Sequence, residues 1–555
     1  MLWFLASAAP AFAHAVLEQT TPPAGTVVAT SPARVSLHFD EQVAIQPGSV
    51  RVFDPASHRV DVGGTRHLDS GGSTIGVDLP HTLPAGTYTV TWRVVSADSH
   101  PVDGSFTFSI GHPSAVSGDV AAQDHGSAAV GWLLGASRLF GYLGLVSCFG
   151  VASVLLMLWP AGRRHASSRR LVWCGWACLV ASSAGALMLE GLYGQGLPLA
   201  RITDPAVLTA TLHTRFGVMA AIRLALVVVI GGFLAGRLRW WRPDEGRKPS
   251  PVPLVGVGFL AFAAVLTWPL AGHAGAGMQA PEAVVSDTVH LLAMSWWLGG
   301  LLLVVAVLSR AGTNDEMRVV MPRFSRLAYW CVIALAASGV YQSWREVGTV
   351  PALTATTFGR LLLVKIGAFV VLVLLGNLAR HWVWRHALPG SARTAFASTG
   401  QADAPTGTID VVTRSALRRG LHAEVLIGLA ILVVTSVLVN VEQARTAYAA
   451  PFVKTTTSST LDVQVAVSPT KVAASHIHVY AYTPAGVPVP LTSLTGTITL
   501  AAKQLGPLPV KFQIAGTGHE IADLTWPAAG RWQLDLALQT GAISTTTLQV
   551  TVPIR

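Results

Sequence analysis

Long runs of apolar residues are the feature that most constrains how this chain folds. Between Val130 and Val441 the hydrophobic side chains gather into stretches of about 20 residues, the length at which a helix crosses the hydrocarbon core of a bilayer. A soluble protein carries about 25% charged residues, whereas only 12% of these residues are Asp, Glu, Lys or Arg. The middle of the chain, 130–441, is therefore expected to be an α-helical membrane domain in contact with the lipid bilayer.

The apolar stretches predict a bundle of eight transmembrane helices. They lie at about 130–159, 171–193, 215–237, 252–271, 284–308, 324–344, 358–384 and 420–441. Arginine and lysine gather in the odd-numbered loops, at Arg163, Arg164, Arg169, Arg170, Arg239, Arg242, Arg247, Lys248, Arg310, Arg318, Arg323, Arg385, Arg393, Arg414, Arg418 and Arg419. Because positive loops stay in the cytoplasm, we expect a multi-pass protein of the cytoplasmic (inner) membrane with both termini extracytoplasmic. The formal charge of +10 is thus a topology signal, and no nucleic-acid partner is expected.

The first thirteen residues resemble a signal peptide. They are apolar and end in Ala11-Phe12-Ala13, the small-x-small pattern that signal peptidase cleaves. A membrane anchor that is not cleaved is the alternative, although the stretch is short for a span. Cleavage would make His14 the first residue of the exported protein.

The segments that flank the apolar region have the period-2 pattern of β-strands. Alternation is clear in 34–39 and 87–94, and again in 461–467 and 532–538. We expect an N-terminal β-sandwich of cupredoxin or immunoglobulin type at 14–112, a flexible linker at 113–129 and a second, C-terminal β-sandwich at 455–555.

Three residues near the start and end of the first β segment form a candidate Cu(II) site. As an N-terminal residue, His14 offers its α-amine and its imidazole to one metal. Asp98 and His100 are two residues apart and point to the same side of an extended chain. Cu(II) favours such nitrogen and oxygen ligands. Taken without His14, Asp98 and His100 are better explained by turn formation before Pro101.

Segment 14–112 resembles the CopC family of periplasmic copper-binding proteins. The matching pieces are His14-Ala-Val-Leu, Thr21-Pro-Pro-Ala-Gly25, Leu37-His-Phe-Asp-Glu41 and Trp92-Arg-Val-Val-Ser-Ala-Asp98-Ser-His100-Pro-Val-Asp-Gly104. The resemblance implies that His14, Asp98 and His100 bind Cu(II). The domain contains no methionine, so it is similar to the members that lack a Met-rich Cu(I) loop.

Ionisable and metal-ligating side chains lie mostly in the outward halves of the predicted spans. Such residues mark either a pathway or a buried structural pair. Asp287, His290 and Met294 are spaced three and four apart and share one helical face. With His273 and Met278 in the preceding loop, they form a candidate copper path, in which thioether would favour Cu(I). The charges assigned to the pathway or to structural pairs are Arg138, Glu190, Arg223, Asp287, Lys365 and Glu424.

The membrane region resembles the CopD family, which occurs fused behind CopC-like domains. The resemblance is carried by Thr214-Arg-Phe-Gly217 with Arg223, by Asp287-Thr-Val-His290 through Trp296-Trp-Leu-Gly-Gly300, by Phe358-Gly-Arg-Leu-Leu-Leu-Val-Lys365, and by Arg419 with Glu424. It implies copper uptake across the inner membrane. The C-terminal segment is distantly similar to small exported YtkA-like or FixH-like domains.

Two further groups have competing interpretations. Cys174 and Cys178 share a helical face and suit either a soft metal or close helix packing, and packing is favoured. His476 and His478 alternate on a predicted strand, where surface histidines are more frequent than ligands; His519 adds little.

The leading hypothesis is copper import, with Cu(II) captured by the exported N-terminal domain and passed to the membrane domain. Exported copper chaperones or a reductase are the further partners that this scheme allows. Copper resistance by sequestration, or sensing without transport, is the alternative. A copper oxygenase is disfavoured because Asp98 would fill a position that such enzymes leave open, and no catalytic residue is assigned. The chain also lacks the phosphate-binding G-x-x-x-x-G-K-[ST] loop of an ATPase pump.

Overall fold

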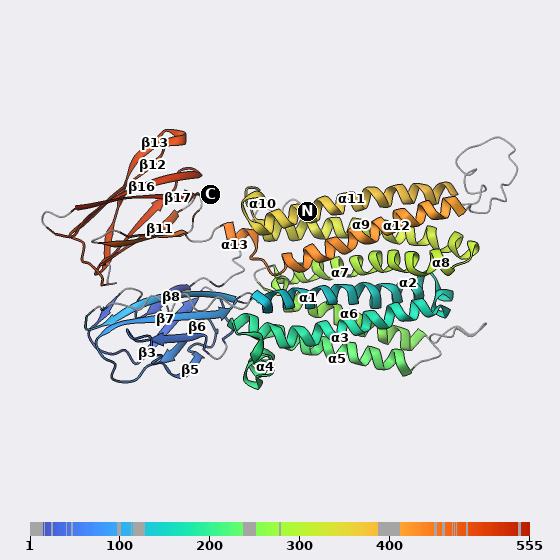
Figure 1. The fold of residues 1–555 in the computed structure, drawn as a ribbon, viewed down its shortest axis with the longest axis horizontal. Coiled ribbons are helices and arrows are strands. Elements are labelled where there is room, and N and C mark those ends of the chain that lie inside the picture. The colour runs from blue at the N-terminus through green and yellow to red at the C-terminus, as the bar shows by residue number, and fades with distance from the viewer. Residues whose placement is uncertain are drawn as a thin grey trace.

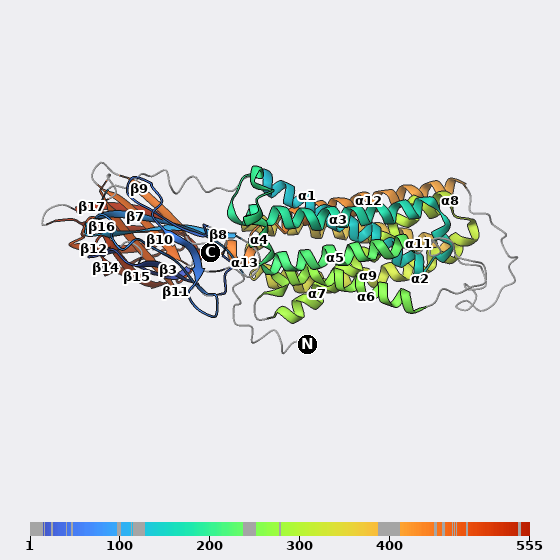
Figure 2. The ribbon, with the colours of Figure 1, turned by 90° about the horizontal axis from the view of Figure 1, so that it is seen from below.

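The computed structural model contains two β domains and one bundle of helices, and both β domains lie at the same end of the bundle (Figures 1 and 2). It describes residues 15, 17–23, 26–39, 41–45, 48–96, 101–112, 114, 128–236, 251–276, 279–386, 411–448, 452–457, 461–468, 470, 472, 474–483, 487–541 and 545–554. The predicted signal peptide, and all of the predicted linker except Ser114, Ala128 and Ala129, lie outside these residues.

Two four-stranded sheets form the N-terminal domain. Its strands are β1 (Leu17–Thr21), β2 (Val27–Val28), β3 (Arg34–Phe39), β4 (Val50–Phe53), β5 (Val62–His67), β6 (Thr74–Asp78), β7 (Gly86–Val95) and β8 (Pro101–Ile110). The sheets have the orders β1-β3-β6-β5 and β2-β8-β7-β4. Val35, Leu37 and Phe39 of β3 are buried and alternate with less buried residues, as the period-2 pattern predicts. Phe39 meets Trp92 of the other sheet edge to face, with ring centroids 5.3 Å apart, in a core shared by both sheets.

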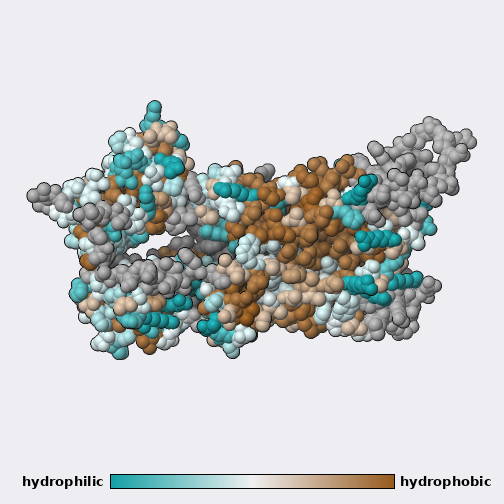
Figure 3. All heavy atoms as spheres, in the orientation of Figure 1, coloured by the Kyte–Doolittle hydropathy of each residue, from teal (hydrophilic) through white to brown (hydrophobic). Residues whose placement is uncertain are grey.

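The middle of the chain is a bundle of long apolar helices. Its main elements are α1 (Ala128–Gly144), η2 (Leu145–Gly150), α2 (Val151–Met157), α3 (Ala166–Gln195), α5 (Arg215–Gly236), α6 (Pro251–Ala271), α7 (Ala280–Leu303), η7 (Val304–Leu308), α9 (Asn314–Val347), α11 (Thr357–His386) and α12 (Val411–Leu438). Short helices connect them: η3 (Pro160–Arg164), η4 (Leu199–Arg201), α4 (Pro205–Leu212), η6 (His273–Gly275), α8 (Ser309–Ala311), α10 (Ala352–Ala355) and α13 (Ala444–Tyr448). Figure 3 shows the apolar belt that these helices present.

Seven helices within the described part of the chain are long and apolar enough to cross a membrane. A further apolar helix, α6 (Pro251–Ala271), has a described apolar stretch over Val255–Ala271 and is not among these seven. It corresponds to the predicted span at 252–271, so the structure accounts for every predicted apolar segment but does not confirm the count of eight.

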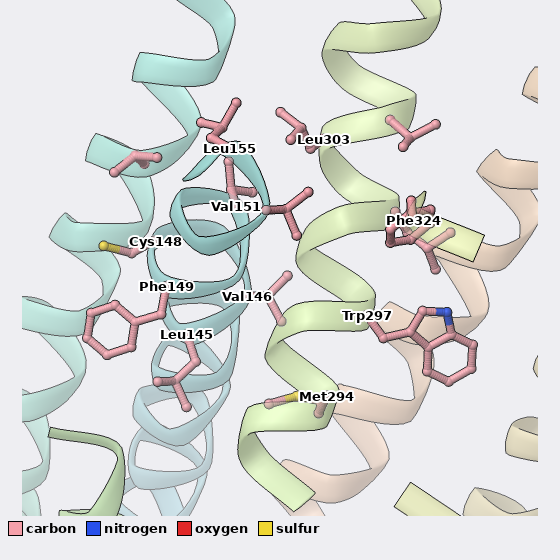
Figure 4. Close-up of a cluster of buried hydrophobic side chains, with 14 of the residues drawn as sticks. Leu145, Val146, Cys148, Phe149, Val151, Leu155, Met294, Trp297, Leu303 and Phe324 are labelled. Carbon is pink, nitrogen blue, oxygen red and sulfur yellow. The ribbon is translucent and has the colours of Figure 1, made fainter. Parts of the chain in front are cut away.

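Close helix packing joins the first and the fifth predicted spans. A Cβ atom on Gly150 of η2 would lie 2.0 Å from the carbonyl oxygen of Ser295 in α7, so only glycine allows this approach. Apolar side chains fill the space on both sides of the contact (Figure 4); the labelled ones are Leu145, Val146, Cys148, Phe149, Val151, Leu155, Met294, Trp297, Leu303 and Phe324.

The C-terminal segment folds into two further sheets. Their strands are β9 (Phe452–Thr457), β10 (Asp462–Ser468), β11 (Ala474–Tyr482), β12 (Ser493–Leu500), β13 (Leu505–Lys511), β14 (Gln513–Gly516), β15 (His519–Thr525), β16 (Gly530–Gln539) and β17 (Thr545–Ile554). The orders are β14-β15-β11-β10-β9 and β13-β12-β16-β17. One hydrophobic cluster, which contains the fully buried Trp526 and Trp532, draws side chains from both sheets.

Candidate functional site

The three predicted Cu(II) ligands His14, Asp98 and His100 lie outside the described residues. Their immediate neighbours are described. The backbone N–H of Ala15 donates to Oγ of Ser96 at 3.2 Å, and the Ser96 hydroxyl in turn donates to the carboxylate of Glu41. Ala15 and Ser96 are both buried. The residue after His14 is thus tied to the residue two before Asp98, although 81 positions separate them in the chain.

The strand pair that flanks residues 97–100 contacts the membrane bundle. Val95 of β7 pairs with Pro101 of β8 at the end of this antiparallel pair. Two residues earlier, the Arg93 guanidinium donates to the carbonyls of Gly194 and Tyr193 at 2.7 and 3.0 Å. These carbonyls belong to the last turn of α3, where a cation is favoured by the orphan acceptors and the helix dipole. The end of the N-terminal domain adjoining 97–100 therefore faces the bundle.

A cavity of about 520 Å³ lies within the bundle. Side chains from α1, α6, α7, α9, α11 and α12 line it, together with η6. Its polar lining is formed by His273, Asp287, His290, Gln342, Ser343, Glu346, Lys365 and Thr435. Most of this lining comes from the helix ends nearer the β domains: α7 and α11 begin there and α9 ends there (Figure 1).

The structure brings together four of the predicted pathway residues. Asp287, His290 and Met294 of α7 line the cavity on one helical face, and Lys365 of α11 lines it as well. The Nδ1 atom of His290 lies 2.9 Å from Oγ of Ser338 in α9. This contact fixes the orientation of the imidazole. Met278 lies outside the described residues.

The predicted loop residue His273 also reaches the cavity, and it meets a carboxylate there. Its Nε2 atom lies 4.0 Å from Oε1 of Glu346 in α9. The neighbouring Arg345 donates to the carbonyl of His273 at 2.9 Å, which holds η6 against the end of α9. Glu346 was missed at the sequence level because the predicted span ended at 344, whereas α9 continues to Val347.

Arg138, Glu190 and Arg223 do not themselves line the cavity, and each has a structural partner. Arg138 of α1 and Glu190 of α3 lie 3.7 Å apart, and Arg138 also donates to the Val439 carbonyl at 3.1 Å. The guanidinium of Arg223 lies 4.0 Å from the ring centroid of Trp268, in a cation–π contact. These contacts favour the structural interpretation for Arg138, Glu190 and Arg223.

Glu424 differs from these charges. Its side chain in α12 is buried, and within the described part of the chain its Oε1 atom accepts no hydrogen bond.

No group of three or more His, Cys, Asp or Glu side chains among the described residues is arranged to hold a metal ion. The cavity wall carries the imidazoles of His273 and His290 and the carboxylates of Asp287 and Glu346. Cys174 is exposed on α3 and Cys178 is half-buried; within the described part of the chain neither joins a metal-binding group.

Comparison with known families matches the N-terminal β domain to one family and successive parts of the helical bundle to two others. The CopC domain family matches residues 17–111, the N-terminal domain of copper resistance protein D-like proteins matches 127–281, and the copper resistance protein D family matches 318–438.

Three individual proteins are similar to all or part of the same region of the chain. The copper transport protein CutJ of Bacillus subtilis is 25% identical over 452 residues, which cover 80% of this chain and 77% of CutJ. Copper resistance protein C of Pseudomonas syringae pv. tomato is 34% identical over 18% of this chain and 81% of its own length. The crystal structure of CopC from Methylosinus trichosporium OB3b is 31% identical and covers 18% of this chain and 95% of that chain, with a TM-score of 0.16.

Proposed function

Because this chain belongs to the family of copper resistance and transport proteins in which a CopC domain precedes a CopD membrane domain, we propose that it imports copper across the cytoplasmic membrane. In this scheme the N-terminal domain captures Cu(II) and passes copper to the cavity of the bundle. The observation that carries the proposal is the position of that cavity. Its polar wall lies in the half of the bundle nearer the capture domain, and Arg93 joins that domain to α3.

The capture site uses the α-amine and imidazole of His14, the carboxylate of Asp98 and the imidazole of His100. Three nitrogens and one oxygen suit the tetragonal geometry that Cu(II) prefers. The hydrogen bond between Ala15 and Ser96 supports this ligand set, because it holds the chain next to His14 beside the chain next to Asp98.

Within the bundle, copper meets His273 and His290 first, with Met294 deeper in the cavity wall. Met278, in the segment that precedes α7, is the further proposed ligand. Imidazole accepts both oxidation states of copper, and the thioether of Met294 favours Cu(I). The carboxylates of Asp287 and Glu346 offset the positive charge of the ion in this low-dielectric setting. An exported chaperone supplying copper, or a reductase acting before passage, would fit this order of ligands.

The orientation of the bundle in the membrane is inferred from the distribution of arginine between its two ends. The loop helices η3 and α8, which carry Arg163, Arg164 and Arg310, lie at the end of the bundle away from the β domains. Positive loops stay cytoplasmic, so both β domains are extracytoplasmic. We further infer that α6 completes eight crossings, since it packs between α5 and α7, and that the two C-terminal sheets form a sandwich around their common core.

The test is copper accumulation in a deletion strain grown under copper limitation. The strain is complemented with the parent chain, with His290→Ala, or with the matched variant His213→Ala, which alters an exposed histidine outside the cavity. Import predicts low copper in the deletion strain and in His290→Ala, and full recovery with the parent and His213→Ala. Unchanged accumulation in the deletion strain would contradict import. Greater copper sensitivity without a loss of uptake would instead support sequestration or resistance.

A further inference from the structure

Two histidines of the C-terminal domain meet on the outer face of its five-stranded sheet. The Nδ1 atom of His478 in β11 lies 3.1 Å from the Nε2 atom of His519 in β15. Both side chains are half-buried. Nothing in the sequence spacing predicts this contact, since the two residues are 41 positions apart.

The strand register explains why the two rings meet. In the antiparallel pair of β11 and β15, His478 lies opposite Ile521 and Tyr480 lies opposite His519. The two histidines are therefore diagonal neighbours on one face, a distance that long ring side chains span. Ile477, Val479 and Ala481 occupy the other face of β11 and are fully buried, so the register that fills the core also fixes the histidine pair.

Aromatic packing holds one of the rings in place. Tyr480 stacks on His519 with ring centroids 4.3 Å apart and an interplanar angle of 14°. The rings of His478 and His519 are themselves nearly parallel, at 18°. Two residues further along each strand, His476 contacts Asp523 at 2.7 Å, so a carboxylate lies on the same face of the sheet.

The separation of the two nitrogens fits a shared metal ion. Two metal–imidazole bonds of about 2.0 Å place their nitrogens about 2.8 Å apart at a right angle and about 3.3 Å apart at the tetrahedral angle, and the observed 3.1 Å lies between these values. A histidine binds a metal through the lone pair of a ring nitrogen, and each of the two facing nitrogens can supply one.

We propose that His478 and His519 form a second copper-binding site in this chain, on the exposed face of the C-terminal sheet. The choice of copper rests on the proposed function, because two imidazoles alone would also accept zinc. The remaining coordination positions are taken by water. A site with two protein ligands binds more weakly than the four-ligand site proposed at His14, and it exchanges its ion more readily.

The position of the sheet supports a role in supplying copper. In Figure 1, β11 lies on the side of the C-terminal domain nearer the N-terminal domain, while β12, β13 and β16 lie on the far side. The outer face of the β11 sheet is thus turned toward the capture domain. Copper bound at His478 and His519 would be held at the same end of the bundle as the capture site.

The proposal is tested on the full-length chain in detergent, with Asp98→Ala and His100→Ala present to remove the first site. This background is titrated with Cu(II) alone, and bound copper is counted by metal analysis and examined by electron paramagnetic resonance. Because the proposed ligands at His14 and in the bundle cavity remain in this background, the result is read as a difference between variants. We expect the background to bind about one Cu(II) per chain more than His478→Ala or His519→Ala, and the additional copper to show a two-nitrogen hyperfine pattern. The matched control is His58→Ala, since His58 is an exposed histidine of the other β domain, paired with Asp54 at 3.4 Å.

Two outcomes would overturn the site. One is a copper content in His519→Ala equal to that of the background; the other is binding of zinc with no binding of Cu(II). His519→Gln serves as a second variant, because glutamine keeps a polar side chain beside Tyr480, and its circular dichroism must match the background. If copper is lost when Asp98 and His100 are replaced but not when His478 or His519 is replaced, the result supports the first site and contradicts the second. The two proposals can therefore be contradicted independently.

Discussion

The backbone N–H of Ala15 donates to the hydroxyl of Ser96 at 3.2 Å, across the N-terminal sheets. Both groups are buried, and Ser96 is itself anchored because its hydroxyl donates to Glu41. The proposed metal site takes His14 from the start of the domain's sequence and Asp98 from near its end, so it needs such a link. The link sets the separation of the two chain segments before any metal binds, which is the preorganisation that strong binding requires.

Replacing Ser96 with alanine is expected to weaken Cu(II) binding by about tenfold, which corresponds to about 1.4 kcal/mol. The substitution leaves the buried N–H of Ala15 without its acceptor, a loss of about 1–3 kcal/mol. The N-terminus would then be held less firmly beside Asp98. Cu(II) titration of the processed chain beginning at His14 measures the change.

Ser31→Ala is the matched control for that titration. The Ser31 hydroxyl donates to the Pro80 carbonyl, so this variant also removes one serine hydrogen bond within the same domain. Equal Cu(II) affinity in Ser96→Ala and Ser31→Ala would contradict the proposed link between Ser96 and the site.

The layout of the chain could be predicted from its sequence because it depends on local patterns. Apolar runs located the helices, and alternation located strands such as β3. Contacts between distant residues could not be predicted in this way. The contact between His478 and His519 depends on the register of β11 against β15, and the sequence of either strand alone does not determine that register. Glu346 was missed for another reason: hydropathy ends a span where polar residues begin, although α9 continues beyond that point.

Glu346→Gln is expected to lower copper uptake roughly fivefold, equivalent to about 1 kcal/mol of lost charge stabilisation. The substitution keeps the shape of the side chain but removes the negative charge 4.0 Å from His273. Uptake of copper by cells expressing equal amounts of each variant provides the measurement. Glu282→Gln removes an exposed carboxylate of α7 outside the cavity and should leave uptake unchanged. If both variants transport equally, Glu346 does not act on copper.

Acid should loosen the turn between β5 and β6. The Thr74 hydroxyl, with the Ser73 hydroxyl and backbone N–H groups, lowers the pKa of Asp69 to about 2. Because the unfolded pKa is higher, about 3.9, this contribution to stability is complete above pH 4 and is lost as the pH falls toward 2. Hydrogen–deuterium exchange of the peptide 62–78 should therefore depend less on acid in Asp69→Asn than in the parent. Asp535→Asn, in the other β domain, should behave as the parent does. An identical acid response in Asp69→Asn would count against this role for Asp69.

Breaking the pair of the half-buried Arg138 and the buried Glu190 is expected to destabilise the bundle by about 3 kcal/mol, the lower end of the range seen when one member of a buried pair is removed. In Arg138→Leu, the Glu190 carboxylate keeps its charge in the interior without the guanidinium 3.7 Å away. The double variant Arg138→Leu/Glu190→Leu removes both charges and should recover most of the loss, since apolar replacements of a buried pair are often neutral. Thermal unfolding of the purified chain in detergent measures both variants. A pathway role predicts a different pattern, in which both variants melt like the parent but transport less copper. Recovery of stability in the double variant, with transport retained, would show that the two residues join α1 to α3 and take no part in moving copper.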